Sequence, residues 1–185
     1  MSMAASQPRF EGQRLIVLMG VAGCGKSTIG AALAAALGTV YLDGDDFHPA
    51  ANVAKMARGE PLQDDDRWPW LDVLGAELAV RQGRVVAGCS ALKRRYRERI
   101  ERAAGEAVTF VHLAGSRAVI EARMAARQGH FMPVSLLDSQ FAALEPPQAD
   151  ERAITVDIDQ TTPAVVAEIL AALGRPAPQS VKDMK

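Results

Sequence analysis

The stretch GVAGCGKS, residues 20–27, constrains the fold of this chain more than any other part of its sequence. It follows the apolar run LIVLM and precedes an alanine- and leucine-rich run, so the sequence predicts a strand, a glycine-rich turn and a helix. The spacing G-x-x-x-x-G-K-[ST] in this context is typical of a phosphate-binding loop. The alternative is a glycine-rich turn that binds nothing. The four matching positions and the correct flanks favour nucleotide binding.

The residue types of this loop have a chemical reason. Glycines let successive backbone N–H groups face one anion, and the helix that follows adds the positive end of its dipole. We expect the Lys26 side chain to reach the β- and γ-phosphates of ATP, and the Ser27 hydroxyl to ligate Mg²⁺. The predicted nucleotide-binding residues are Gly20, Val21, Ala22, Gly23, Cys24, Gly25, Lys26, Ser27 and Thr28.

Composition sets the class of protein. A length of 185 residues with 49% hydrophobic residues allows a buried core in one domain, which we expect over residues 1–185 with flexible ends at 1–13 and 175–185. A net charge of −1 gives no drive toward nucleic acid or membranes. Only Cys24 and Cys89 are cysteines, and residues 1–13 lack a signal-peptide core, so we expect no structural disulfide and a cytoplasmic location.

Short β-rich runs alternate with helical runs along the chain, which is the pattern of a parallel sheet covered on both faces. The predicted strands lie at 15–19, 40–42, 84–89, 109–113 and 154–158. The predicted helices lie at 26–37, 51–56, 69–82, 92–103, 117–127, 133–144 and 163–173. We therefore expect a three-layer α/β/α fold that binds ligands beyond the carboxyl ends of its strands.

Acidic residues follow the second predicted strand. Asp43 and Asp45 flank Gly44, which lets the chain turn tightly between them. A carboxylate here can orient a substrate hydroxyl, accept its proton or hold Mg²⁺ through water. The alternative is a solvated turn, since Asp and Gly are ordinary turn residues. The position of Asp45 directly after a strand favours a functional role for this residue over a solvated turn. Asp46 is a weaker candidate for such a role.

The third predicted strand ends at Cys89, where many P-loop proteins carry a metal-coordinating aspartate, and this departure argues against a motor or a GTPase. Lys93 and Arg97 follow, four residues apart on one predicted helix face, where they can clamp an anion. The basic cluster also raises the possibility of RNA binding. Because Glu98 and Glu101 interrupt it and no aromatic platform is evident, we expect no nucleic-acid partner.

Two further basic sites stand out. Arg67 lies beside Trp68 and can pair with a substrate carboxylate, while Asp66 is the expected cap of the helix predicted from Pro69. Arg123 and Arg127 lie four residues apart before a glycine-containing hinge, which predicts a lid at about 123–145 that carries charge over phosphates. The alternative for these two is a pair of surface arginines at a helix end.

Several stretches, read in order, resemble the gluconokinases, which are small P-loop kinases. The matching stretches are GVAGCGKS, LDGDDFHP, NVAKMARGEPLQDDDRWPWL, CSALKRRYR, RQGHFM, SQFAALEPP and VDID, and they run from residue 20 to 159. The loop is shared by many families, whereas the stretches around 45, 64–71 and 89–97 are together specific. Asp46 departs from the pattern, because an apolar residue can stand there in relatives.

The resemblance implies transfer of phosphate from ATP to the 6-hydroxyl of D-gluconate, a parallel sheet in the order 2-3-1-4-5, a closing lid and a homodimer. Gluconate has a carboxylate that suits Arg or Lys and hydroxyls that suit Asp or His. The predicted acceptor-binding residues are therefore Asp45, His48, Arg67 and Lys93. The predicted catalytic residues are Lys26, Arg123 and Arg127 at the γ-phosphate and Asp45 at the 6-hydroxyl.

Two other functions remain open from the residues. A shikimate or nucleotide kinase would use the same loop with a different acceptor pocket. A regulator that binds ATP without an acceptor would also carry this loop.

Overall fold

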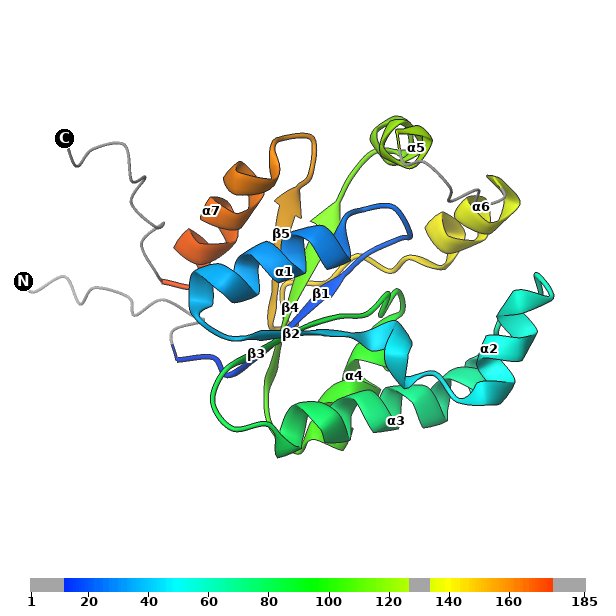
Figure 1. Cartoon of the computed structure of the whole chain (residues 1–185), viewed down its shortest axis with the longest axis horizontal. Helices are drawn as coiled ribbons and strands as arrows, with labels where there is room; N and C mark the ends of the chain where they lie inside the picture. Colours follow the sequence, from blue (N-terminus) through cyan, green and yellow to red (C-terminus); the bar gives the residue numbers. More distant parts are fainter. Residues whose placement is uncertain (1–11, 127–133, 175–185) are drawn as a thin grey trace, which may run out of the picture.

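A five-stranded parallel sheet has β1 at its centre, as Figure 1 shows. The structure is a computed structural model that describes residues 12–126 and 134–174. β1 (Leu15–Met19) lies between β3 (Val85–Gly88) and β4 (Val108–Ala114), and β2 (Val40–Asp43) and β5 (Ala153–Asp157) form the edges. The strand order β2-β3-β1-β4-β5 confirms the predicted order 2-3-1-4-5.

Helices cover both faces of the sheet (Figure 1). α1 (Lys26–Leu37) and α7 (Thr162–Ala172) pack together on one face. α3 (Asp64–Val80) and α4 (Arg94–Ala104) pack together on the other. This arrangement confirms the predicted three-layer α/β/α fold.

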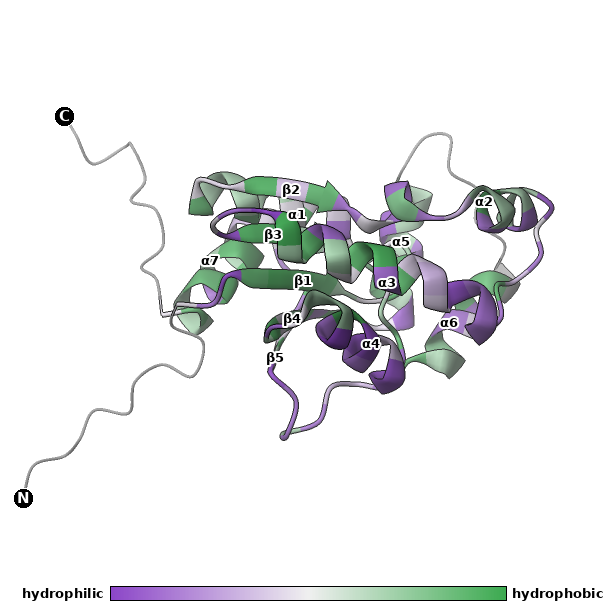
Figure 2. Ribbon diagram, turned by 90° about the horizontal axis from the view of Figure 1, so that it is seen from below, coloured by the Kyte–Doolittle hydropathy of each residue, from purple (hydrophilic) through white to green (hydrophobic). Residues whose placement is uncertain are grey.

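The core consists of two apolar layers, one on each side of the sheet. All five residues of β1 are fully buried, and alternate residues enter opposite layers. A central strand that is buried on both faces carries a continuous apolar run rather than an alternating one. Figure 2 shows this run in green along β1, whereas α4 is largely hydrophilic. Cys24 and Cys89 are buried and free, so the expected absence of a disulfide is confirmed.

The remaining elements gather at the carboxyl end of the sheet, on the right in Figure 1. They are the 3₁₀ turn η1 (Gly44–Phe47), α2 (Ala50–Ala57), α5 (Arg117–Ala125) and α6 (Val134–Ala143). The predicted lid includes the end of α5 and all of α6, but Arg127 lies outside the described residues, so the lid stays a prediction. In the described ranges, no helix combines the length and the apolar character needed to cross a bilayer.

α3 begins earlier than predicted. The sequence indicated a start at Pro69 with Asp66 as the cap, but the helix begins at Asp64, and both expectations are wrong. The Asp66 carboxylate accepts the Gln63 N–H at 2.6 Å, so Asp66 lies in the first turn and reaches back to the capping residue. Pro69 therefore lies inside the helix.

Candidate functional site

The glycine-rich loop joins β1 to α1 as predicted. Gly25 caps α1 with φ +100°, a left-handed conformation that favours glycine. Among the described residues, the N–H groups of Gly25, Lys26 and Ser27 meet no acceptor. Unpaired N–H groups at a helix N-terminus, together with the helix dipole, form an anion site.

Lys26 folds back over this loop. Its Nζ lies 3.1 Å from the Gly20 carbonyl oxygen and 3.2 Å from that of Val21. Within the described part of the chain, no carboxylate pairs with this ammonium group. Its charge is therefore available to a phosphate.

Ser27 and Asp43 bring oxygen ligands together beside the loop. The Ser27 hydroxyl donates to Asp43 Oδ2 at 3.2 Å, and Asp43 Oδ1 accepts the Asp45 N–H at 3.1 Å. Hydroxyl and carboxylate oxygens are hard ligands of the kind Mg²⁺ takes, and this ion is usually held by one or two protein groups together with phosphates and water. In residues 12–126 and 134–174 there is no cluster of three or more His, Cys, Asp or Glu that suits a metal. Ser27 and Asp43 thus fit a phosphate-bound Mg²⁺ rather than an all-protein site.

Asp45 lies on η1 with its side chain 79% exposed. Among the described residues, no Lys or Arg forms an ion pair with it, and the His48 Nε2 atom lies 3.8 Å from Asp45 Oδ1. The carboxylate is therefore accessible to an external hydroxyl.

His48, in contrast, is held on several sides. Its ring stacks on Trp70 with centroids 3.9 Å apart, and its Nδ1 lies 3.3 Å from Asn52 Nδ2. Burial lowers the pKa of His48; the charge of Asp45 opposes this shift and that of Arg67 adds to it. The ring is therefore neutral at pH 7. Trp70 itself is buried.

Lys93 is part of a charged cluster on α3 and α4. Its Nζ lies 3.1 Å from Asp64 Oδ1, and the Tyr96 hydroxyl and Arg95 also contact this carboxylate. The pKa of Asp64 is lowered, mainly by the hydrogen bond from Tyr96; burial opposes this shift, and Lys93 and Arg95 add to it. Asp64 therefore stays ionised and balances part of the charge of Lys93.

Arg67 lies close to the same cluster. Its guanidinium donates to the Leu62 and Gln63 carbonyl oxygens and lies 5.6 Å from the centre of the Tyr96 ring. No carboxylate among the described residues forms an ion pair with it. Arg67 therefore has no ion-pair partner in the described chain, and its role as an acceptor-binding residue stays a prediction.

Arg97 does not share the role expected for Lys93. The sequence indicated that both residues could clamp an anion, but the Arg97 side chain is buried and paired within the protein, so that expectation is wrong for Arg97. Its guanidinium makes two bonds to Glu151, at 2.6 and 2.9 Å, and donates to the Ala91 carbonyl oxygen. Arg97 thus holds α4 to the turn before β5.

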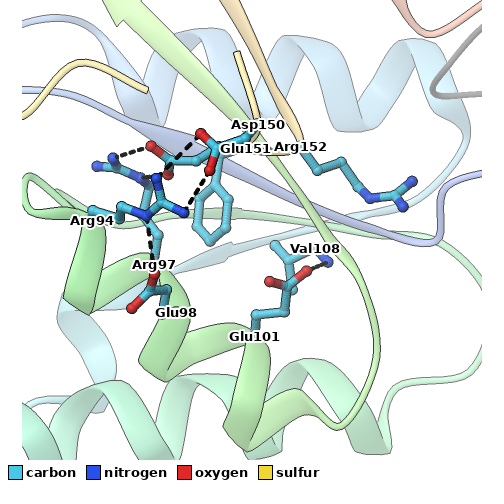
Figure 3. A pocket seen from close by; sticks show the side chains of 9 residues that line it. Arg94, Arg97, Glu98, Glu101, Val108, Asp150, Glu151 and Arg152 are labelled. Atoms are coloured by element: carbon cyan, nitrogen blue, oxygen red, sulfur yellow. Dashed lines mark hydrogen bonds and ion pairs between the residues drawn. The ribbon is translucent and has the colours of Figure 1, made fainter. Parts of the chain in front are cut away.

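A cavity of about 390 Å³ lies around this ion pair (Figure 3). In Figure 3, Arg94 and Arg97 point toward Asp150 and Glu151, whereas Arg152 points away. No residue predicted to bind nucleotide or acceptor lines the cavity. Because Arg94 and Arg97 are paired with Glu98, Asp150 and Glu151, the cavity is a structural hollow and not the candidate site. Its lining residues are Arg94, Arg97, Glu98, Glu101, Val108, Phe110, Asp150, Glu151 and Arg152.

Arg123 connects α5 to the loop. Its guanidinium donates to the Cys24 carbonyl oxygen at 3.3 Å, to that of Gln160 at 3.2 Å and to that of Ile158. Its side chain thus lies against the phosphate-binding loop and the turn that follows β5. Its role at the γ-phosphate stays a prediction, as does that of Arg127.

Gln140 is a contact that the residue patterns did not predict. Its Oε1 accepts the Ala22 N–H at 2.6 Å, so α6 reaches the phosphate-binding loop. No spacing rule indicated this contact, because 118 residues separate the two partners. Only the resemblance, through the stretch SQFAALEPP, included this residue.

Known proteins are similar to this chain over most of its length. A family model described as an AAA domain matches residues 15–147. A probable gluconokinase of Mus musculus is 43% identical, over 89% of this chain and 100% of its own. The thermosensitive gluconokinase of Escherichia coli is 49% identical, over 77% and 78%. The crystal structure of a gluconokinase from Sinorhizobium meliloti is 47% identical with a TM-score of 0.82, over 90% and 95%. The chain therefore belongs to the gluconokinase family.

Proposed function

We propose that this protein transfers the γ-phosphoryl group of ATP to the 6-hydroxyl of D-gluconate. The observation that carries the proposal is the contact between the phosphate-binding helix and the acceptor turn. The Ser27 hydroxyl on α1 bonds to Asp43, and Asp43 bonds to the backbone of Asp45. A phosphate on the loop and a hydroxyl at Asp45 would thus lie at one end of the sheet.

Asp45 suits the acceptor hydroxyl. Its exposed carboxylate accepts a hydrogen bond from the 6-hydroxyl and takes its proton as the new bond from oxygen to the γ-phosphorus forms. The bond from the γ-phosphorus to the bridging oxygen breaks, and ADP leaves with that electron pair. Phosphoryl transfer depends mainly on positioning and charge neutralisation, which fits a site with little covalent chemistry.

Three cations are candidates for the transferring phosphoryl group. Lys26 carries a charge with no carboxylate partner in the described chain, and Arg123 lies against the loop. Arg127, four residues further on, is the third. Ser27 and Asp43 are the residues that would hold Mg²⁺, which when bound neutralises phosphate charge.

Arg67 and Lys93 are the candidates for the gluconate carboxylate. Arg67 has no acidic partner in the described chain, whereas Lys93 shares its charge with Asp64. The planar guanidinium of Arg67 presents several N–H donors, and because no acidic side chain pairs with it, it suits a planar carboxylate. We therefore assign the main carboxylate contact to Arg67 and a secondary one to Lys93.

Gln140 links nucleotide binding to α6. A phosphate oxygen that takes the Ala22 N–H displaces Gln140 Oε1, because the donor has one hydrogen. This exchange supports a site in which the predicted lid region responds to nucleotide. A cytoplasmic location and a homodimer also belong to the proposal, and sedimentation at several concentrations tests the second.

A coupled ADP-release assay tests the function. We expect rapid turnover with D-gluconate and very slow turnover with glucose, shikimate or nucleoside monophosphates. Glucose has the 6-hydroxyl but no carboxylate, so it leaves Arg67 and Lys93 without an anion. Equal turnover of glucose and gluconate, or preference for another acceptor, overturns the substrate. ATP binding without turnover of any acceptor indicates a regulator instead.

A further inference from the structure

Asn52, on α2, is a buried polar residue that the sequence patterns did not single out. Its Nδ2 lies 2.7 Å from the Asp66 backbone oxygen. A carbonyl oxygen only accepts hydrogen bonds, so the side-chain atom that faces it is the amide nitrogen. This contact fixes which way the Asn52 amide is turned.

The same nitrogen determines the protonation of His48. Nδ2 lies 3.3 Å from His48 Nδ1, and an amide nitrogen only donates. Nδ1 must therefore accept, which leaves the hydrogen of the neutral ring on Nε2. The His48 side chain is only 5% exposed and stacks on Trp70, so the ring is held in this orientation.

The Nε2–H group then faces Asp45. The distance of 3.8 Å from Nε2 to Asp45 Oδ1 is too long for a direct hydrogen bond. A hydroxyl oxygen about 2.8 Å from each atom fits between them. Such a hydroxyl accepts from His48 and donates to Asp45, and so uses both of its hydrogen-bonding capacities.

We infer that Asn52 is a positioning residue that fixes the Nε2–H tautomer of His48, so that His48 and Asp45 form the donor and acceptor halves of one hydroxyl-binding pair. The tautomer follows from the protein alone. The identity of the hydroxyl, that of a sugar acid, rests on the proposed function. A phosphate-accepting substrate that lacks this hydroxyl leaves both His48 and Asp45 without a hydrogen-bond partner. The pair therefore contributes to substrate specificity.

Nitrogen-15 NMR of the imidazole rings tests the tautomer without any substrate. We expect His48 of the full-length wild type to show the Nε2–H form, assigned by comparison with His48→Gln. Asn52→Asp replaces the donor with an acceptor, so Nδ1 gains a hydrogen. If the aspartate variant does not fold, Asn52→Ala replaces it. This variant removes the donor, so we expect a mixture of the two His48 tautomers. A wild-type ring with its hydrogen on Nδ1, or a tautomer unchanged in a folded variant, overturns the inference.

Steady-state kinetics tests the pair. We expect Asn52→Asp to raise the KM for gluconate about tenfold, the effect of one lost hydrogen bond, with the KM for ATP unchanged. Val53→Ala, on the same helix but 51% exposed, is the matched control and leaves both constants unchanged. A variant with an altered tautomer and an unaltered gluconate KM overturns the pair. If the wild type does not phosphorylate gluconate while NMR shows the Nε2–H form of His48, the proposed function fails and the tautomer assignment stands.

Discussion

Arg97 and Glu151 form a buried bidentate ion pair between α4 and the turn that precedes β5. The guanidinium bonds to both carboxylate oxygens, at 2.6 and 2.9 Å. It also donates to the Ala91 and Leu92 carbonyl oxygens. The guanidinium therefore satisfies four acceptor oxygens, and the Arg97 side chain is only 2% exposed.

Arg97→Leu should lower the free energy of unfolding by about 3–5 kcal/mol, because it leaves the Glu151 charge buried without the guanidinium. Urea unfolding at pH 7 measures this. Arg99→Leu is the control, since Arg99 on the same helix pairs with Asp72 at the surface and should contribute about 0–1 kcal/mol. Equal losses of unfolding free energy in the two variants would contradict the larger contribution expected for the buried pair.

Glu151 should make stability depend on pH. Burial raises its pKa, but the hydrogen bonds from Arg97 and the Gln148 N–H outweigh this effect, so the pKa lies below its ordinary 4.5. The folded state thus favours the carboxylate. Its stabilisation is fully present above the unfolded pKa and is lost as the pH falls through the lower folded pKa. Between pH 6 and pH 3, wild type should therefore lose more unfolding free energy than Glu151→Gln. If unfolding free energy falls with pH equally in wild type and Glu151→Gln, Glu151 does not contribute to the pH dependence of stability.

Asp45→Asn should lower kcat by about 10²–10⁴-fold while the KM for gluconate changes little, because the amide keeps the shape but cannot take a proton. The neighbouring exposed Asp46→Asn is the control and should behave as wild type. If only KM moves, Asp45 orients the acceptor and is not the base.

Arg67→Met should raise the KM for gluconate about ten- to a hundredfold, the effect of one charge-assisted contact of about 1.5–3 kcal/mol. Turnover of glucose should stay unchanged, so competition between the two acceptors reports the loss directly. Arg95→Met removes a more exposed cation from the same cluster and is the control. A larger effect of Arg95→Met would move the carboxylate site.

Asp43→Asn should raise the Mg²⁺ concentration needed for half-maximal activity, because a neutral oxygen replaces a charged one beside Ser27. A titration with Mg²⁺ at saturating ATP measures the shift. Asp46→Asn again serves as the control. An unchanged titration curve would remove Asp43 from the metal-binding residues.

The sequence predicted correctly those parts of the molecule whose structure depends on residues close together in the chain. The strand, loop and helix around Lys26 have the predicted bounds, because glycine positions and an apolar run determine them locally. The order of the strands came from the resemblance, since residue patterns alone do not define neighbours in a sheet.

The parts that escaped prediction depend on partners distant along the chain. Helix spacing indicated that Arg97 could clamp an anion together with Lys93, but its partner is Glu151, which is 54 residues away. The contact of Gln140 with Ala22 spans 118 residues, and no local pattern contains it. Pro69 was a misleading start for α3, because the carboxylate of Asp66 stabilises the helix start before it.

The burial of Cys24 and Cys89 should protect both thiols from oxidants. Both thiols lie in the apolar core, and burial raises the pKa of Cys89 to about 12. Since the thiolate is the form that peroxide and alkylating reagents attack, Cys89 offers them little to react with, and burial shields the sulfur of Cys24 in the phosphate-binding loop. Labelling of either thiol requires the core to open, so the labelling rate measures how often the surroundings of the loop unfold.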